Sequence, residues 1–216
     1  MSNEPAKPKR AVYDITPPIT PNLGVWPGDT PPSRDVLMDI AKGDTVTLST
    51  LRTTVHLGAH ADGPNHYGLN APSIDQRPLD RYLGLCQVMP IDIARGERFG
   101  VAQLTDAIRA ERVLFETGTF PDPENWNDDF AAIDPDLIDH LAAHGVKLVG
   151  LDTPSVDLKE SKDLPTHRRI LQHDLALLEA LVLKRVPAGL YELIALPLPL
   201  VGFDASPVRA VLRELD

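Results

Sequence analysis

Short runs of alternating or continuous apolar residues dominate the chain and predict many β-strands. In one of them, Val46 and Leu48 alternate with Thr45 and Thr47, as in a strand with one buried face. Other runs are almost wholly apolar, as in a buried strand. The strands predicted in this way are 11–16, 35–40, 45–55, 85–93, 112–116, 146–151, 181–183, 191–196 and 208–212.

Helical spacing of apolar residues is rarer and predicts two or three helices. The clearest begins at Asp134-Pro135, because Asp is a favoured N-cap and Pro a favoured first helical residue. Its predicted end is Gly145. Two further helices are predicted, one over 100–109 and one within 166–178. Many strands with a few helices predict a mixed α/β fold in a single domain.

The composition agrees with one globular domain that is rich in loops. The 216 residues are 43% apolar and 24% charged, and they include 21 prolines, which is about twice the usual share. Proline is excluded from helix interiors and central strands, so segments such as 17–32 are expected to be loops. Residues 1–10 are charged and lack the apolar core of a secretory signal. We therefore expect a short disordered leader over 1–10 and one domain over 11–216.

Charge and cysteine content narrow the classes of function. Lys and Arg number 21 and Asp and Glu 31, and the net charge of −10 disfavours nucleic acid and anionic membranes as partners. The longest apolar run, 193–203, has 11 residues, far short of the roughly 20 that span a bilayer. Cys86 is the single cysteine, so no intramolecular disulfide and no thiolate-rich zinc site can form, and we expect it to be buried and inert. These features predict a cytoplasmic protein.

Three histidines and one aspartate cluster within the segment 56–66. They are His56, His60, Asp62 and His66. Imidazole and carboxylate are ligands that zinc and similar cations use. All four occupy even positions, so an extended backbone would direct them to one face, and Gly58 between the first two has no side chain to block that face. Ligand atoms must lie about 2 Å from an ion, so the segment must bend, and Gly58 and Gly63-Pro64 allow bends.

A metal site needs at least three protein groups, so later residues are expected to contribute. Glu179 lies within a run of leucines, where an unpaired carboxylate costs several kcal/mol. It either pairs with a cation or reaches solvent at a helix end. His167 and His173 compete as a further ligand. Because His167 and Glu179 are 12 residues apart, or about 18 Å along one helix, the helix must end between them for both to reach one centre. Spacing alone leaves the choice of histidine open.

Other polar and aromatic residues fit structural roles as well as functional ones. His140 and His144 have helical spacing and fit a solvated helix face. Asp152 and Asp204 each follow an apolar strand, a common place for site residues, but each also begins a turn near a proline, which favours a capping role. Trp26, in the Pro-rich loop, either walls an apolar pocket or covers the edge of the core.

The segment His56-Leu-Gly-Ala-His60-Ala-Asp62-Gly-Pro-Asn-His66 resembles the metal motif of the cyclase-like hydrolases, which include bacterial kynurenine formamidase (arylformamidase) and isatin hydrolase. Segments similar to the formamidase branch extend the likeness from about residue 11 to the C-terminus, and they are 25–29, 150–155, 178–182 and 204–213. Many relatives have Thr where this chain has Leu57 and Ala where it has Gly63. We expect little effect from Leu57 and added flexibility beside Asp62 from Gly63.

The resemblance implies a compact, barrel-like β core flanked by helices, and a homodimer. It also implies two zinc ions bridged by Asp62, with His66 as the catalytic acid and base, and it favours His167 over His173. Manganese or cobalt would suit the same nitrogen and oxygen ligands. The metal ligands that it implies are His56, His60, Asp62, His167 and Glu179.

The activity implied by the resemblance is hydrolysis of N-formyl-L-kynurenine to formate and L-kynurenine in tryptophan degradation. Zinc lowers the pKa of its bound water to about 7 and polarises a carbonyl oxygen. His66 would carry a proton from water to the leaving aniline nitrogen, and Trp26 would pack on the aryl ring. Two alternatives are a cyclic amide or lactone hydrolase similar to isatin hydrolase, with one manganese, and a metal- or ligand-binding protein without turnover.

Overall fold

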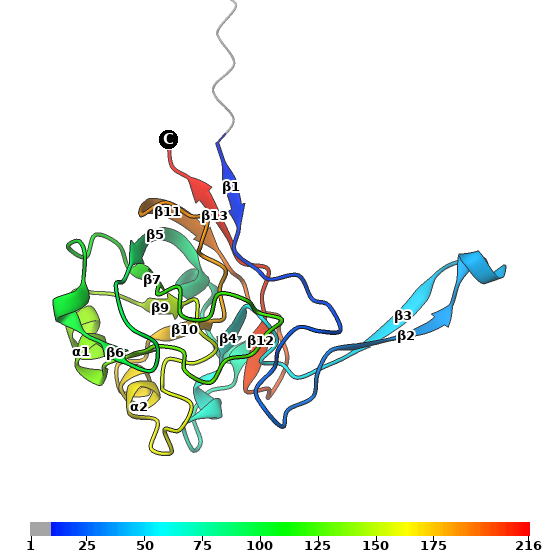
Figure 1. The fold of residues 1–216 in the computed structure, drawn as a ribbon, viewed down its shortest axis with the longest axis horizontal. Helices are drawn as coiled ribbons and strands as arrows, with labels where there is room; N and C mark the ends of the chain where they lie inside the picture. The colour runs from blue at the N-terminus through cyan, green and yellow to red at the C-terminus, as the bar shows by residue number, and fades with distance from the viewer. Residues whose placement is uncertain (1–9) are drawn as a thin grey trace, which may run out of the picture.

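The computed structural model describes residues 10–216, and its framework is a nine-stranded mixed β-sheet (Figure 1). In chain order the strands of this sheet are β1 (Val12–Asp14), β4 (His60–Asp62), β5 (Leu83–Pro90), β7 (Arg112–Glu116), β9 (Leu148–Leu151), β10 (Ala176–Glu179), β11 (Gly189–Ile194), β12 (Ala205–Pro207) and β13 (Val211–Glu214). Their order across the sheet is β1-β13-β11-β5-β7-β9-β10-β4-β12. The neighbours β5, β7, β9 and β10 run parallel, and the strands on either side pair antiparallel.

The central strands are buried on both faces, which explains their continuous apolar sequences. In β9, Leu148 belongs to one buried cluster and Val149 to another. Helices α1 (Pro135–Ala143) and α2 (Pro165–Gln172) cover the cluster that contains Val149, and Tyr82 and Leu193 belong to the cluster on the opposite face. The sheet curls into a half-barrel with few helices, which confirms the predicted single-domain α/β fold with a barrel-like core.

Most predicted elements are present, several with shifted ends. Strand β7 covers the predicted range 112–116 residue for residue. The side chain of Asp134 accepts the N–H of Asp136 at the start of α1, and Gly145, with φ +78°, follows its end. The predicted leader, apart from Arg10, lies outside the described residues.

The predicted helix over 100–109 is wrong, because only a 3₁₀ turn, η5 (Val101–Gln103), forms there. Hydrogen bonds to a neighbouring strand replace the helical ones. The Gln87 side chain donates to the carbonyl of Ala107 at 2.9 Å and accepts the N–H of Arg109 at 2.8 Å. Leu104 and Ile108 pack against the core from an irregular segment, whereas Val101 is exposed.

The predicted strand over 181–183 is also wrong, because the strand in this region, β10, ends at Glu179. Ala180 has a φ of +53°, which ends the extended backbone. Only the end of the predicted strand 208–212 is confirmed, because residues 208–210 lie between β12 and β13, and β13 begins at Val211. A long apolar run such as 175–183 indicates that its residues are buried, but it does not indicate where a strand ends.

Residues 33–52 form a hairpin that projects away from the body of the molecule (Figure 1). It consists of the antiparallel strands β2 (Ser33–Met38) and β3 (Leu48–Arg52), with a 3₁₀ turn, η1 (Ile40–Lys42), near the tip. A short parallel pair, β6 (Arg98–Phe99) and β8 (Ala132–Ile133), lies on the opposite side of the body. Within residues 10–216, each helix is too short or too polar to cross a bilayer.

Candidate metal centre

Two neighbouring strands place three donor side chains on one face of the sheet. Strand β4 carries His60 and Asp62, and β10 carries Glu179. The antiparallel register sets Glu179 directly opposite His60, so the two side chains share a face, and Asp62 shares it two residues along. All three are buried. Glu179 is therefore a strand residue with its carboxylate in the interior, not a helix-end residue in solvent.

Bends on both sides of β4 and the start of α2 bring in the remaining histidines. Gly58 has a φ of +52°, and a Cβ there would lie 2.9 Å from Pro17 Cγ, so this bend requires glycine. His56 precedes the bend, and His66 ends a 3₁₀ turn, η2 (Pro64–His66), that follows β4. His167 lies in the first turn of α2. The segment thus bends on both sides of β4, as predicted.

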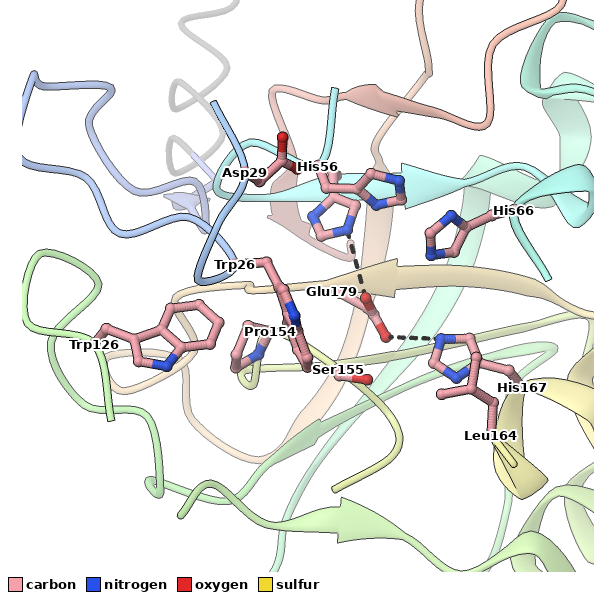
Figure 2. A pocket seen from close by; sticks show the side chains of 11 residues that line it. Trp26, Asp29, His56, His66, Trp126, Pro154, Ser155, Leu164, His167 and Glu179 are labelled. Carbon is pink, nitrogen blue, oxygen red and sulfur yellow. Dashed lines mark ion pairs between the residues drawn. The ribbon is translucent and has the colours of Figure 1, made fainter. Parts of the chain in front are cut away.

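Histidine ring nitrogens lie close to the carboxylates of both Asp62 and Glu179, and Figure 2 shows this arrangement for Glu179. Asp62 Oδ1 lies 3.2 Å from His56 Nδ1 and 3.4 Å from His60 Nε2. The other oxygen, Asp62 Oδ2, lies 3.8 Å from His167 Nε2. Glu179 lies 3.4 Å from His60 Nε2 through Oε2 and 3.7 Å from His167 Nε2 through Oε1. The structure brings these five side chains together, and the two oxygens of Asp62 face different histidines.

These contacts suit a divalent cation better than a network of hydrogen bonds. Two ligands bound to one tetrahedral zinc ion lie about 3.3 Å apart, and the three shortest contacts measure 3.2, 3.4 and 3.4 Å. His60 Nε2 and both oxygens of Asp62 are buried without a hydrogen-bond partner, which is costly unless a cation satisfies them. The donors form two triads that share Asp62, namely His56, His60 and Asp62, and Asp62, His167 and Glu179.

Each histidine of the two triads also contacts a hydrogen-bond acceptor that lies outside the triads. Each of these contacts uses the ring nitrogen that faces away from Asp62 and Glu179. The ring nitrogen that faces Asp62 and Glu179 can therefore keep its lone pair for a cation. The contacts are His60 Nδ1 with the Gly58 carbonyl (2.8 Å), His167 Nδ1 with Asp157 Oδ2 (2.8 Å) and His56 Nε2 with Asp204 Oδ2 (3.1 Å). The chain therefore orients its imidazoles as metal sites do.

Sequence reasoning misses Asp157. Its fully buried carboxylate also receives the Arg98 guanidinium at 2.8 Å and the backbone N–H of His167 at 3.1 Å. Asp157 lies ten residues before His167, and no motif within the chain joins the two.

Asp152 and Asp204, the two aspartates that were expected to follow apolar strands, have different roles. Asp204 lies between two histidines, with Oδ2 at 3.1 Å from His56 Nε2 and 3.5 Å from His66 Nδ1. The expectation that Asp204 follows a strand is wrong, because Asp204 ends a loop and directly precedes β12. Asp152 instead caps a loop, because it accepts the backbone N–H groups of Thr117 and Gly118.

The other candidate histidines lie outside the cluster. His173 follows the end of α2, and its Nε2 lies 2.6 Å from Asp139 Oδ1. His140 and His144 pack against each other at the C-terminal end of α1. Of the two competing histidines, the structure brings only His167 to the carboxylates.

Carboxylates dominate the electrostatics of the cluster. Burial opposes protonation of His60, but Asp62 and Glu179 outweigh it and raise the pKa of His60 to about 10. Burial also opposes protonation of His56 and His167, but neighbouring carboxylates raise the pKa of both histidines. Burial would raise the pKa of Asp62, yet the adjacent histidines hold it well below its ordinary value. The centre therefore favours positive charge, which a divalent cation supplies.

A cavity of about 280 Å³ opens onto the cluster (Figure 2). The imidazoles, including that of His66, lie on one side of this cavity. The His66 side chain is 37% exposed, and its partial burial lowers its pKa. On the other side are Trp26 and Trp126, whose rings meet edge to face with centroids 5.6 Å apart. Trp26 thus walls a pocket, one of its two predicted roles. The remaining lining residues are Asp29, Pro154, Ser155 and Leu164.

Gly63 is required by close packing. Its φ of −83° is open to any residue, but a Cβ would lie 2.7 Å from Asn65 Oδ1 and 2.9 Å from the backbone nitrogen of Ile74. Its N–H donates to the carbonyl of Asp204 at 2.7 Å. The expected flexibility beside Asp62 is therefore wrong, because this residue is tightly held.

Comparison with known proteins gives the chain a family. The Cyclase family model, described as "Putative cyclase", matches residues 13–158. A solved structure described as a "potential metal-dependent hydrolase with cyclase activity" has a TM-score of 0.82 and 27% identity over 96% of this chain and 100% of its own. A "predicted metal-dependent hydrolase from Bacillus stearothermophilus" has a TM-score of 0.81 and 28% identity over the same shares.

A third match shares the fold at lower identity. Isatin hydrolase A from Labrenzia aggregata, bound to benzyl benzoate, has a TM-score of 0.80 and 19% identity over 96% of this chain and 94% of its own. Because the family model matches well over half of the residues, and because the fold and the donor cluster agree with it, the chain belongs to the Cyclase family of metal-dependent hydrolases.

Proposed function

We propose that the chain is an arylformamidase that hydrolyses N-formyl-L-kynurenine to formate and L-kynurenine. The observation that carries this proposal is the division of one cavity into an imidazole and carboxylate side and an aromatic side. An aryl formamide has the matching halves, a small amide to be cut and a flat ring. The likeness of segments 25–29 and 204–213 to the formamidase branch supports the same substrate, and membership of the Cyclase family is compatible with it.

The residues that would hold the metal are the two triads sharing Asp62. We infer two zinc ions, because the oxygens of Asp62 face different histidines, and manganese or cobalt would suit the same donors. A divalent cation in such a site polarises a carbonyl oxygen and makes water acidic enough to react near neutral pH. The chain's own contribution is to fix the donors, through Gly58, Asp157 and Asp204, before the cation arrives.

His66 is the proposed acid and base. Its Nδ1 faces Asp204, and the ring borders the cavity beside His56, with ring centroids 4.2 Å apart. As water adds to the formyl carbon, His66 accepts the proton that the water loses. When the carbon–nitrogen bond breaks, the same proton passes to the aniline nitrogen, which leaves as L-kynurenine while the formyl group leaves as formate. Imidazole performs both transfers near neutral pH.

The aromatic side of the cavity would hold the ring of the substrate. Trp26 and Trp126 present an edge-to-face pair, and Phe130 lies against both. A ring packed on such a surface gains about 0.5–1.5 kcal/mol beyond its buried area. This contact orients the formyl group toward His66 at the opposite wall.

The test is hydrolysis of N-formylkynurenine beside isatin by zinc-loaded protein, followed through product absorbance. We expect turnover of the formamide and little of the cyclic amide. His66→Ala should retain zinc and lose at least about 10²-fold in kcat, whereas His173→Ala, a histidine outside the cluster, should keep both. Preference for isatin, or loss of zinc in His66→Ala, would contradict the proposed substrate or the proposed role.

A further inference from the structure

The wall of the cavity carries one charged side chain, Asp29, that neither the proposed metal centre nor the proposed proton transfer uses (Figure 2). The other lining residues are uncharged or are the histidines and Glu179 of the cluster, and none of them is Lys or Arg. Asp29 is exposed, and its Oδ1 accepts the N–H of Thr30 at 2.6 Å. Its Oδ2 has no hydrogen-bond or ion-pair partner within residues 10–216, so this oxygen is free to bind a ligand.

A tight turn joins Asp29 to the aromatic side of the cavity. The segment Trp26-Pro27-Gly28-Asp29 closes because the N–H of Asp29 donates to the carbonyl of Trp26 at 2.9 Å. Pro at the second position and Gly, with a φ of +97°, at the third are the residues that a type II turn favours. Such a turn holds its first and fourth Cα atoms within about 7 Å. The indole of Trp26 and the carboxylate of Asp29 therefore extend from neighbouring points of the same wall.

The proposed substrate has a cationic group at a matching place. In N-formyl-L-kynurenine, one ring carbon carries the formamide, and the adjacent ring carbon carries a ketone chain that ends in an amino acid. Four single bonds of about 1.5 Å separate the ring from the ammonium nitrogen, which gives a reach of about 5 Å. A ring that packs on Trp26, with its formamide toward His66, therefore brings its ammonium group within reach of Asp29.

The charge around the cavity favours the ammonium group over the carboxylate of the same amino acid. Because the lining contains neither Lys nor Arg, no guanidinium or lysine ammonium of the wall can pair with a substrate carboxylate. Asp204, whose side chain is 45% exposed, places a second carboxylate beside His56 and His66. The net charge of −10 on the whole chain also disfavours an anionic group.

We propose that Asp29 determines specificity by binding the ammonium group of the substrate, while the carboxylate of the substrate remains in solvent. This inference rests on the proposed function, and it narrows the substrates to aryl formamides that carry a cationic amine on the neighbouring chain. An ion pair at an exposed site strengthens binding by up to about fivefold. The expected effect is therefore a change of a few fold in KM that depends on the amine.

Three formamides that differ only in these two groups test the proposal on zinc-loaded protein. They are N-formyl-L-kynurenine, N-formylkynurenamine, which lacks the carboxylate, and the deamino analogue of N-formyl-L-kynurenine, which lacks the ammonium group. Wild type should hydrolyse the first two with similar KM, and KM for the deamino analogue should be about 3- to 5-fold higher. Equal KM for all three, or a KM that rises when the carboxylate is lost, would overturn the proposal.

Two variants separate binding of the amine from a structural effect. Asp29→Asn removes the charge but keeps an oxygen that can accept the N–H of Thr30, so the turn should persist. In this variant, KM for the two amines should rise to that of the deamino analogue, whereas a merely structural role would raise all three. Asp163→Asn is the matched control, because Asp163 is also exposed and precedes the lining residue Leu164 but does not itself line the cavity. An Asp29→Asn variant that still prefers the amines, or an equal loss of preference in Asp163→Asn, would refute the assignment.

Binding of the reaction products separates this inference from the proposed function. Calorimetry with zinc-loaded protein measures the Kd of L-kynurenine and of its deamino analogue without turnover. Wild type should bind L-kynurenine about 3- to 5-fold more tightly, and Asp29→Asn should bind both compounds equally. If this preference holds but no formamide is hydrolysed, the proposed function fails and the amine site stands. If the formamides are hydrolysed but wild type binds both products equally, or binds neither, the amine site fails alone.

Discussion

Replacement of Asp157 by asparagine should weaken zinc binding without removing any proposed ligand. Asp157 is fully buried, and its Oδ2 lies 2.8 Å from the outer nitrogen of His167. Burial would raise its pKa, but His167 and Arg98 lower the pKa of Asp157 to about 2, so the group is a carboxylate at neutral pH. Asparagine has nearly the same shape but no charge, and its amide group replaces one of the two accepting oxygens.

The expected loss follows from the contacts of this carboxylate. Removing the outer partner of a ligand histidine costs about 10- to 100-fold in metal affinity, equivalent to about 1.4–2.7 kcal/mol. The Arg98 guanidinium also loses its charged acceptor at 2.8 Å. A hydrogen bond to a charged group contributes about 1.5–3 kcal/mol, so the free energy of unfolding should fall by a similar amount.

Competition with a chromophoric chelator at fixed pH measures the zinc Kd of each variant. Asp152→Asn is the matched control, because Asp152 is also buried and hydrogen-bonded but caps a loop and contacts no histidine. We expect Asp157→Asn to raise the zinc Kd and Asp152→Asn to leave it unchanged. Equal affinities of Asp157→Asn and wild type, or an equal loss in both variants, would refute the role assigned to Asp157.

Three further predictions concern packing and protonation. Gly63→Ala should lower the free energy of unfolding by about 1–3 kcal/mol, because the new Cβ would lie within 3 Å of Asn65 and Ile74; an unchanged Tm would contradict this. Cys86 is 0% exposed, and burial raises the pKa of its thiol. A thiol reagent should therefore label Cys86 only under unfolding conditions, and rapid labelling of the native chain would contradict this prediction. Because its carboxylate neighbours raise the pKa of His60 to about 10, zinc must displace a proton, and its Kd should fall as pH rises from 6 to 8. Calorimetry in buffers of different ionisation enthalpy measures that proton release, and its absence would count against the cluster as the binding site.

Local signals in the sequence predict the elements that they also stabilise. The Asp134 cap and the Pro135 that follows it begin α1 where expected, because both act within one turn of the helix. The apolar run 112–116 predicts a strand, and the structure has one there, because its apolar residues are buried on both faces of the sheet. Such features depend on few distant contacts.

Elements that depend on tertiary contacts could not be predicted. Hydrogen bonds from Gln87 hold residues 100–109 out of a helix, and a single left-handed residue, Ala180, ends β10. Strands were expected over 35–40 and 45–55, but alternating apolar residues do not reveal that β2 and β3 pair only with each other and project from the body. Gln87 is 20 residues from Ala107, so no pattern within 100–109 reveals these hydrogen bonds.

The same distinction between local signals and tertiary contacts applies to the candidate site. The spacing of four donors in 56–66 and the glycine bends beside them are local, and they sufficed to place this segment around a centre. Neither the spacing nor the composition of the sequence could favour His167 over His173, because only the folded position of the first turn of α2 brings His167 to Asp62 and Glu179. Asp157 needed the folded structure, because its role depends on the orientation of one imidazole ring.

The most direct test of the account is the number of zinc ions bound per chain, measured by equilibrium dialysis and elemental analysis. Wild type should bind two ions, His173→Ala should also bind two, and Asp62→Asn should bind fewer, because both triads share the Asp62 carboxylate. A wild-type chain that binds no zinc at micromolar free metal, or an Asp62→Asn chain that binds as much as wild type, would contradict the central claim that this cluster is a metal centre.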